Sequence, residues 1–355
     1  MRRSTTAALL LTAALALSGC ALRPARAEAP APAPTAAASP SPRPTPEPTP
    51  TPSPTATPVP PPREEEIAGV RFSTDAEELC FDDVPLTPED LADLEELLPE
   101  MPYLKRVSML RCGVDDETME ALDRRHEDVR FVWMVQVYSY GVRTDQTWFS
   151  VYNCEYRYPT DNKVAEALGY CHDMEAVDLG HMHTYGDTAF FTKMPHLRYL
   201  IISNAAHTAI PELASLKELE WLEVHQTSFQ DLSPLLECPA LRHLNIVYKK
   251  VPTEEARRTD VDILKQMTWL KRLWIGGNMY LPDQVEELRA ALPDTEIHVV
   301  TGTLTLEGGW RKDEAYFRMR DALHMYYMTD DGHTVEVNPY TGERSLYEWT
   351  NPFRK

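Results

Sequence analysis

One short frame, leucine-x-x-leucine-x-apolar, recurs along the middle of the chain at a nearly constant spacing. Three copies contain Leu200, Leu222 and Leu244, which lie 22 residues apart, and a fourth contains Leu273 after a longer gap of 29. Side chains alternate between the two faces of a strand, so each frame predicts a short strand with its apolar residues on one face. A unit this short can bury that face only against its neighbours, so the chain is expected to form a stacked solenoid.

These frames resemble leucine-rich repeats, and residues 219–235 resemble the bacterial internalin type closely. The positions that match the internalin pattern are Leu219, Leu222, Val224, Thr227, Phe229, Leu232 and Leu235. The resemblance covers roughly residues 70–136 and 164–300, including partial frames at 104–114 and 174–179. It implies an α/β leucine-rich-repeat solenoid, with parallel strands on the concave face and short helices or turns on the convex face. It does not identify the ligand, because one fold hosts many functions.

The start of the chain resembles a bacterial lipoprotein signal peptide. Arg2 and Arg3 precede a short apolar run, and the run ends at Leu17-Ser18-Gly19-Cys20, which matches a lipobox. The run is too short to span a bilayer and has the small residues of a cleavage site. The resemblance implies that Cys20 becomes the lipidated N-terminus and that the protein is anchored at the extracytoplasmic face of the cell membrane. An ordinary secretory signal with a chance cysteine is the alternative.

Composition separates a stalk from an acidic body. Residues 21–63 are rich in Pro, Ala, Thr and Ser, so they are expected to be a disordered spacer that reaches up to ~130 Å. The whole chain carries 35 Lys and Arg against 55 Asp and Glu. This balance argues against nucleic acid as a partner, which needs a cationic surface.

The sequence therefore predicts six segments. They are the signal peptide 1–20, the stalk 21–63, a first repeat array 64–137, a hairpin-like insertion 138–163, a second repeat array 164–300, and a helix and hairpin forming a C-terminal cap 301–355.

Local signals place several elements within these segments. Pro88 begins a helix with a leucine stripe at 91–98, and a strand is expected at 130–137. Asp313 can cap a helix that carries Tyr316, Met319, Leu323 and Tyr326 on one face, and residues 334–337 and 344–348 alternate like a hairpin. The repeat register assigns Leu222 and Leu244 to the interior and Leu216 to the convex edge, where it should contribute less.

The cysteines and histidines give weak signals for chemistry. Cys112 occupies the repeat position that favours Asn or Cys, so it is expected to be buried and free. Cys154 and Cys171 could form a disulfide, but their spacing does not decide it. Cys171-His172 with His181, His183 and Asp187 could ligate zinc. Polar residues are ordinary in such a turn, so no metal site and no cofactor are predicted. No phosphate-binding glycine loop, nucleophile elbow or H-E-x-x-H motif occurs, so no enzyme activity is predicted.

Residues between the core leucines should form columns that are exposed on the concave face. The columns contain large aromatic and hydrogen-bonding residues, which are enriched at binding sites. The predicted ligand-binding residues are Tyr199, Trp221, Glu223, His225, His243, Asn245, Tyr248, Arg272 and Trp274. The alternative is structural: the two tryptophans pack on each other or under the terminal cap.

The leading hypothesis is a lipid-anchored extracellular recognition module that binds a protein, peptide or glycan on this concave face. A structural envelope scaffold is the alternative. A metal-dependent enzyme that uses the His-rich turn ranks third.

Overall fold

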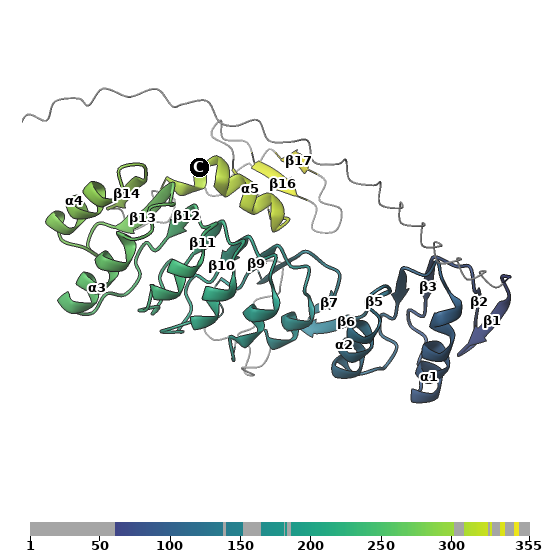
Figure 1. Ribbon diagram of the computed structural model, residues 1–355. Helices are drawn as coiled ribbons and strands as arrows, with labels where there is room; N and C mark the ends of the chain where they lie inside the picture. Colours follow the sequence, from purple (N-terminus) through teal and green to yellow (C-terminus); the bar gives the residue numbers. More distant parts are fainter. Residues whose placement is uncertain are drawn as a thin grey trace, which may run out of the picture. The chain divides into compact units, whose positions relative to one another are not determined.

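The structure is a computed structural model that describes residues 61–137, 140–151, 165–180, 182, 186–301 and 309–325. Three further short strands are described by their backbone. The chain divides into two compact units, Met1–Thr57 and Pro58–Lys355, and all elements below belong to the second (Figure 1).

The first array contains a small parallel sheet in the order β3-β4-β5. Its strands are β3 (Glu78–Cys80), β4 (Arg106–Ser108) and β5 (Arg130–Val132). An antiparallel hairpin precedes it, formed by β1 (Glu64–Ile67) and β2 (Val70–Ser73). The connections between its strands are α1 (Pro88–Leu97) with the 3-10 turn η1 (Leu98–Glu100), and α2 (Asp116–Arg125). Thr87 and Asp90 cap α1 reciprocally, and Leu94, Leu97 and Leu98 are buried, which confirms the predicted helix.

The second array contains a seven-stranded parallel sheet in chain order, from β8 to β14. Its strands are β8 (Trp148–Ser150), β9 (Ala176–Asp178), β10 (Tyr199–Ile201), β11 (Trp221–Glu223), β12 (His243–Asn245), β13 (Arg272–Gly276) and β14 (Glu296–Val300). The connections contain η3 (Glu166–Tyr170), η4 (Ala189–Lys193), η5 (Pro211–Ser215), η6 (Ser233–Glu237), α3 (Glu254–Leu264) and α4 (Pro282–Ala291). The described residues therefore form the α/β, leucine-rich-repeat-like solenoid that the sequence predicts.

The strand register matches the predicted repeat frame. Leu200 lies beside Leu222, Leu222 beside Leu244, and Leu244 beside Leu273, and all four side chains are fully buried. Leu216, expected to contribute less from the convex edge, is equally buried, so the expectation of a peripheral side chain is wrong. Its side chain belongs to the same core cluster as the strand leucines, because the convex connections also pack inward.

The region between the two arrays differs from the sequence-based boundaries. Strand β5 ends before Trp133, which makes two hydrogen bonds to Thr144. The Trp133 amide donates to Thr144 Oγ1 at 3.2 Å, and the Thr144 amide donates to the Trp133 carbonyl oxygen at 3.0 Å. The chain then forms an antiparallel hairpin of β6 (Met134–Val137) and β7 (Tyr140–Arg143). The single strand expected at 130–137 is therefore two strands. Moreover, β8 lies within 138–163 and still pairs with β9 of the second sheet. One continuous core cluster nevertheless runs from Ile67 to Leu288.

The longer gap before the fourth repeat is occupied by helix α3, which supplies a partner for a buried lysine. Lys249 stands eight residues after Leu241, where Thr227 stands after Leu219. Its Nζ donates to Asp260 Oδ2 of α3 at 2.7 Å, and both side chains are about 1% exposed. The Tyr280 hydroxyl donates to the same oxygen at 3.0 Å. A buried charge needs such partners, so the insertion has a local physical reason.

The thiols agree with one expectation and leave another as a prediction. Cys112 is buried and free, as predicted. Cys171 is buried and free among the described residues, and Cys154, its possible disulfide partner, lies outside them. Burial raises the pKa of the Cys171 thiol to about 12, which leaves it protonated and unreactive at neutral pH.

The C-terminal elements follow the sequence expectation in part: the predicted helix ends at Ala322 with Leu323 as its C-cap, and Tyr326 lies outside the described residues. They are the turn η8 (Trp310–Lys312), the helix α5 (Glu314–Ala322), and the antiparallel strands β15 (Tyr327–Met328), β16 (Thr334–Val337) and β17 (Arg344–Tyr347). Asp313 caps α5 by accepting from the Ala315 amide at 2.8 Å. No helix in the described part of the chain has the length and apolar character needed to cross a bilayer.

Candidate functional site

The predicted columns form as expected on the second sheet. Tyr199, Trp221, His243 and Arg272 are neighbours on successive strands, and Glu223, Asn245 and Trp274 are neighbours in the adjacent column. The parallel register brings these residues together because each repeat contributes the same position.

Their rings make a ladder across the strands. The Trp221 ring lies 5.5 Å from the His243 ring and 5.5 Å from the Trp274 ring, measured between centroids. Trp274 in turn stacks on His298 of the last strand, with centroids 5.5 Å apart. At the other side of the face, His225 contacts Tyr248 edge to face at 5.7 Å. Such spacings are those of favourable aromatic pairs.

The expectation that these residues are exposed is wrong for most of them. Trp221 and Trp274 are at most 1% exposed, and Tyr199, Glu223, His225, His243 and Asn245 are also buried, whereas Tyr248 and Arg272 are half-buried. The reason is residues 309–325, here named the C-terminal segment, which pack on the concave columns. Figure 1 shows α5 of this segment beside the strands of the second sheet.

The C-terminal segment and the columns form their own apolar cluster. The segment contributes Trp310, Ala315, Tyr316, Met319, Leu323 and Met325, all of them buried. Tyr316 lies 6.0 Å from Trp221, and Trp310 lies 5.9 Å from His225, measured between ring centroids. Asp313, the cap of α5, also makes an ion pair of 2.6 Å with Arg272. The apolar stripe of α5 therefore packs on the aromatic columns.

Among the described residues, several polar groups are buried in this contact without a hydrogen-bond partner. They are Trp221 Nε1, Glu223 Oε2, His243 Nδ1, Asn245 Nδ2, Tyr248 Oη, Trp310 Nε1 and Arg311 Nε. A buried group left without a partner costs ~1–3 kcal/mol. The polar match of the C-terminal segment to the sheet is therefore incomplete.

The ionisable groups of the columns respond to this burial. Burial raises the pKa of the Glu223 carboxyl, against the opposing charge of Arg311, and Ser203 donates to the carboxylate at 3.3 Å. Burial also lowers the pKa of His243 to about 4, which holds that ring neutral at neutral pH. The covered face thus disfavours charge at both positions.

Tyr248 has an unusual backbone. Its φ is +60°, in the left-handed region that bulky residues rarely adopt. Asn204 and Gln226, at the same place in the two preceding repeats, are also left-handed. The turn after each strand therefore imposes this conformation, and Tyr248 accepts it while its ring packs on His225.

The histidine-rich turn, the candidate zinc site, lies largely outside the described residues. His181 and His183 lie outside those residues. His172 Nδ1 lies 3.1 Å from the Lys193 carbonyl oxygen, and Cys171 is buried. In the described part of the chain, no three His, Cys, Asp or Glu side chains gather to hold a metal ion. Cys20, the predicted lipidation site, also lies outside the described residues.

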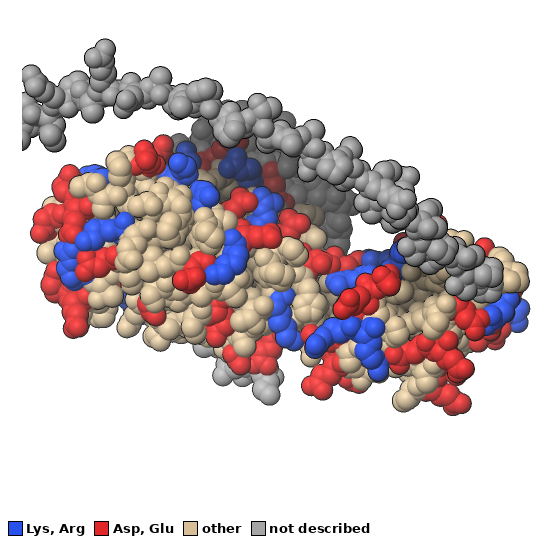
Figure 2. All heavy atoms as spheres, viewed as in Figure 1, with Lys and Arg blue, Asp and Glu red and all other residues tan. Residues whose placement is uncertain are grey.

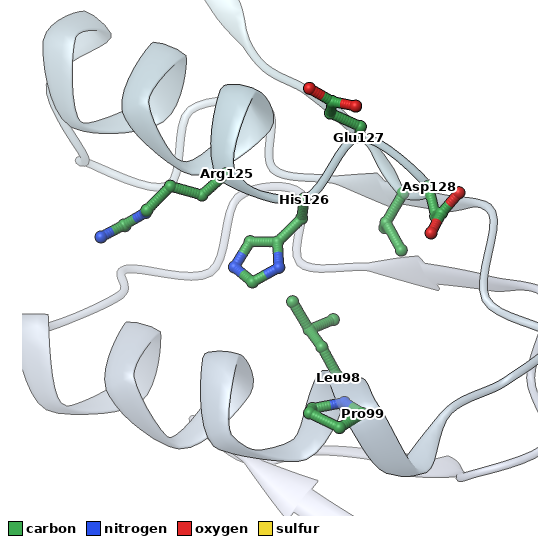
Figure 3. A pocket seen from close by; sticks show the side chains of 7 residues that line it. Leu98, Pro99, Arg125, His126, Glu127 and Asp128 are labelled. Atoms are coloured by element: carbon green, nitrogen blue, oxygen red, sulfur yellow. The ribbon is translucent and has the colours of Figure 1, made fainter.

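An open pocket of about 430 Å³ lies between the ends of α1 and α2 (Figure 3). His126 faces Leu98 and Pro99 across it, and His126 Nε2 is 3.0 Å from Glu95 Oε1. Glu95 also pairs with Arg125 at 3.0 Å. These contacts satisfy the polar side chains locally, so the pocket has the character of a surface hollow between two helices.

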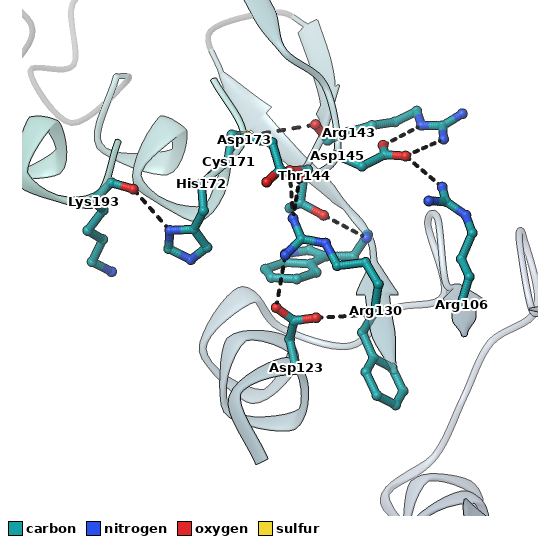
Figure 4. Close-up of polar contacts among 12 residues, drawn as sticks. Arg106, Asp123, Arg130, Arg143, Thr144, Asp145, Cys171, His172, Asp173 and Lys193 are labelled. Atoms are coloured by element: carbon teal, nitrogen blue, oxygen red, sulfur yellow. Dashed lines mark hydrogen bonds and ion pairs between the residues drawn. The ribbon is translucent and has the colours of Figure 1, made fainter. Parts of the chain in front are cut away.

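A network of ion pairs crosses from the first array to the second (Figure 4). Arg130 of β5 pairs with Asp123 at 3.4 Å and with Asp173, just before β9, at 2.9 Å. Arg106 and Arg143 share the carboxylate of Asp145, at 2.6 and 2.8 Å. Each of these arginines has a carboxylate partner, so the network joins the two arrays structurally. More widely, Figure 2 shows acidic and basic side chains interspersed over the visible face.

The structure agrees with the alternative given from the sequence, in which the two tryptophans pack on each other and under the terminal cap. The sequence analysis did not identify Trp310, or the apolar stripe of α5, as the covering surface, although an amphipathic helix must bury its stripe. The stripe and the columns lie far apart in the sequence, and nothing local pairs them.

Comparisons with known proteins concern the fold. No protein-family model and no curated protein sequence match the chain. Among solved structures, it is similar to internalin C2 from Listeria monocytogenes, with 19% identity and a TM-score of 0.32 over 39% of this chain and 56% of that one. A second internalin from the same species shows 12% identity and a TM-score of 0.31 over 65% and 69%. A leucine-rich-repeat protein from Leptospira interrogans shows 10% identity and a TM-score of 0.29 over 68% and 51%. The chain thus spans little more than half the length of internalin C2.

Proposed function

We propose that this protein is a recognition module that binds a protein or peptide ligand through the concave face of its second array. The observation that supports this most is that the face already holds a polypeptide segment. It does so with rigid aromatic side chains, among them Trp221 and Trp274, and with an ion pair from Arg272. Tyrosine, tryptophan and arginine are the residues that most often anchor protein partners.

The rest of the chain suits a module held outside the cell. The lipobox at Cys20 would attach the protein to the membrane, and the proline-rich stalk would hold the body away from it. The C-terminal segment would then act as the cap of the array, covering the concave columns until a ligand arrives. The acidic balance of the chain disfavours nucleic acid as that ligand.

A protein ligand has better support than a glycan, because the occupant of the face is a helix with an apolar stripe. The structural scaffold remains the second candidate, favoured by the ion-pair network that joins the arrays. A scaffold would tolerate changes on the concave face without losing its neighbours.

Site-specific photo-cross-linking in intact cells tests the proposal. A photoreactive phenylalanine analogue replaces the half-buried Tyr248 at the edge of the concave face, and in a control it replaces the exposed Tyr103 of the first array. A protein adduct that forms from position 248, and not from position 103, is expected. No adduct at 248, or the same adducts at both positions, would overturn binding through this face.

A further inference from the structure

The C-terminal segment packs on a surface that the solenoid core does not use. The main core cluster contains the inward leucines of the sheet, such as Leu222 and Leu244, and it closes without residues 309–325. The second cluster joins the segment to the outward residues of the same strands. The two clusters lie on opposite faces of one sheet, so removing the segment would leave the main core in place.

The C-terminal segment leaves some described polar groups of the contact without hydrogen bonds. Among the described residues, the unpartnered atoms on the sheet side include the Trp221 indole nitrogen and the Asn245 amide nitrogen, and both residues are fully buried. Both groups are hydrogen-bond donors. An occupant that placed carbonyl or carboxylate oxygens beside these two donors would match the face better than the segment does.

We infer that the C-terminal segment is a built-in competitor, and that the partner of this face is an amphipathic helix that displaces it. This inference rests on the proposed function, since it concerns the same face. The segment itself shows the pattern that the face accepts. An acidic residue at the helix N-cap pairs with Arg272, as Asp313 does, and apolar residues follow in the places of Tyr316, Met319 and Leu323.

Competition from a tethered segment has a calculable effect. A segment joined to its site by a short connection acts at an effective concentration of about millimolar. The apparent dissociation constant of a partner is its intrinsic constant divided by the fraction of open molecules. Opening the face should therefore tighten the apparent binding of any helix that fits it.

The experiment uses the full chain and a labelled synthetic peptide of residues 309–325. Met319→Asp places a charge in the fully buried centre of the contact and should release the segment. Arg318→Asp places a charge on the exposed side of the same helix and is the matched control. Fluorescence anisotropy is expected to show the peptide binding Met319→Asp at least ~10-fold more tightly than wild type or Arg318→Asp. A peptide that itself carries Met319→Asp should not bind.

Hydrogen exchange of the wild-type chain gives a second measurement. The amides of α5 should open by a local event and exchange faster than those of β10 to β12. If α5 exchanges only with the sheet, or if Met319→Asp loses the circular dichroism of the solenoid, the segment is an obligatory part of the fold and the inference is wrong. A Met319→Asp chain that is folded but does not bind the peptide would also overturn the inference.

The outcome is separable from that of the proposed function. Peptide binding without any adduct at position 248 in cells would support a displaceable segment and refute ligand binding through this face. An adduct at position 248 without peptide binding would support ligand binding and refute competition by the segment.

Discussion

Trp221 shows how one contact changes the role of a side chain. Strand alternation alone places it on the outer face, where a substitution would have little effect. The structure buries it completely between His243, Trp274 and Tyr316. Its energetic role is therefore that of a core residue.

Trp221→Ala should weaken the packing of the C-terminal segment by ~3–5 kcal/mol, because a large buried ring is lost and a cavity remains. Urea titrations followed by tryptophan emission measure the loss. Tyr103→Ala, at a side chain that is half exposed, is the control and should change stability by no more than ~0.5 kcal/mol. An unchanged urea transition for Trp221→Ala would show that the Trp221 ring is exposed to solvent and does not pack under the C-terminal segment.

His243 predicts a pH dependence. Burial lowers its pKa to about 4, an effect that Arg272 and Arg318 reinforce and that Asp313 and Glu220 oppose. The unfolded chain binds the proton near pH 6.5, whereas the folded chain does so only near pH 4. Stability from this group is therefore complete above pH 6.5 and is lost as the pH falls towards 4.

His243→Gln removes this titration and keeps a polar side chain of similar size. Its unfolding free energy, measured from pH 7 to pH 4, should fall less steeply than that of wild type. Equal slopes for the two proteins would show that His243 is protonated without penalty in the folded state.

At the scale of elements, the sequence predicted what is local or periodic. The strand register, the columns, the helix that begins at Pro88, the N-cap at Asp313 and the paired strands β16 and β17 all follow from short patterns. The split of residues 130–137 at Trp133 was not predicted, because it depends on hydrogen bonds to Thr144 across a hairpin. The covering of the columns was only the alternative interpretation, for a related reason. An apolar stripe on a helix predicts that the helix packs on some surface, but it does not identify that surface.

The buried ion pair of Lys249 and Asp260 couples helix α3 to the repeat that contains strand β12. Asp260→Ala should cost ~3–5 kcal/mol, because it leaves the lysine ammonium buried without its counter-charge. The double change Lys249→Met with Asp260→Leu removes both charges and should recover most of that loss. Thermal unfolding of the three proteins measures the coupling. A double variant no more stable than Asp260→Ala alone would show that the loss comes from altered packing.

At the scale of the whole molecule, the proposed membrane attachment depends on a single residue. Cys20→Ala should abolish incorporation of labelled fatty acid and leave the signal peptide uncleaved, because the thiol that would carry the lipid is gone. Metabolic labelling followed by mass measurement checks both effects, and wild type is the positive control. Label on the variant, or none on wild type, would refute the anchor.

The buried lysine also limits how this array could lengthen. A duplication that copied only the 22 residues beginning at Leu241, residues 241–262, would repeat Lys249 and Asp260, but it would end α3 before Leu264 and leave out Tyr280, which donates to Asp260. The two preceding units have Ala205 and Thr227 at the same place and need no such helper. Tandem copying of 22 residues therefore leaves the units that begin at Leu197 and Leu219 whole, whereas the unit that begins at Leu241 keeps the surroundings of its buried ion pair only if the stretch through Tyr280 is copied with it.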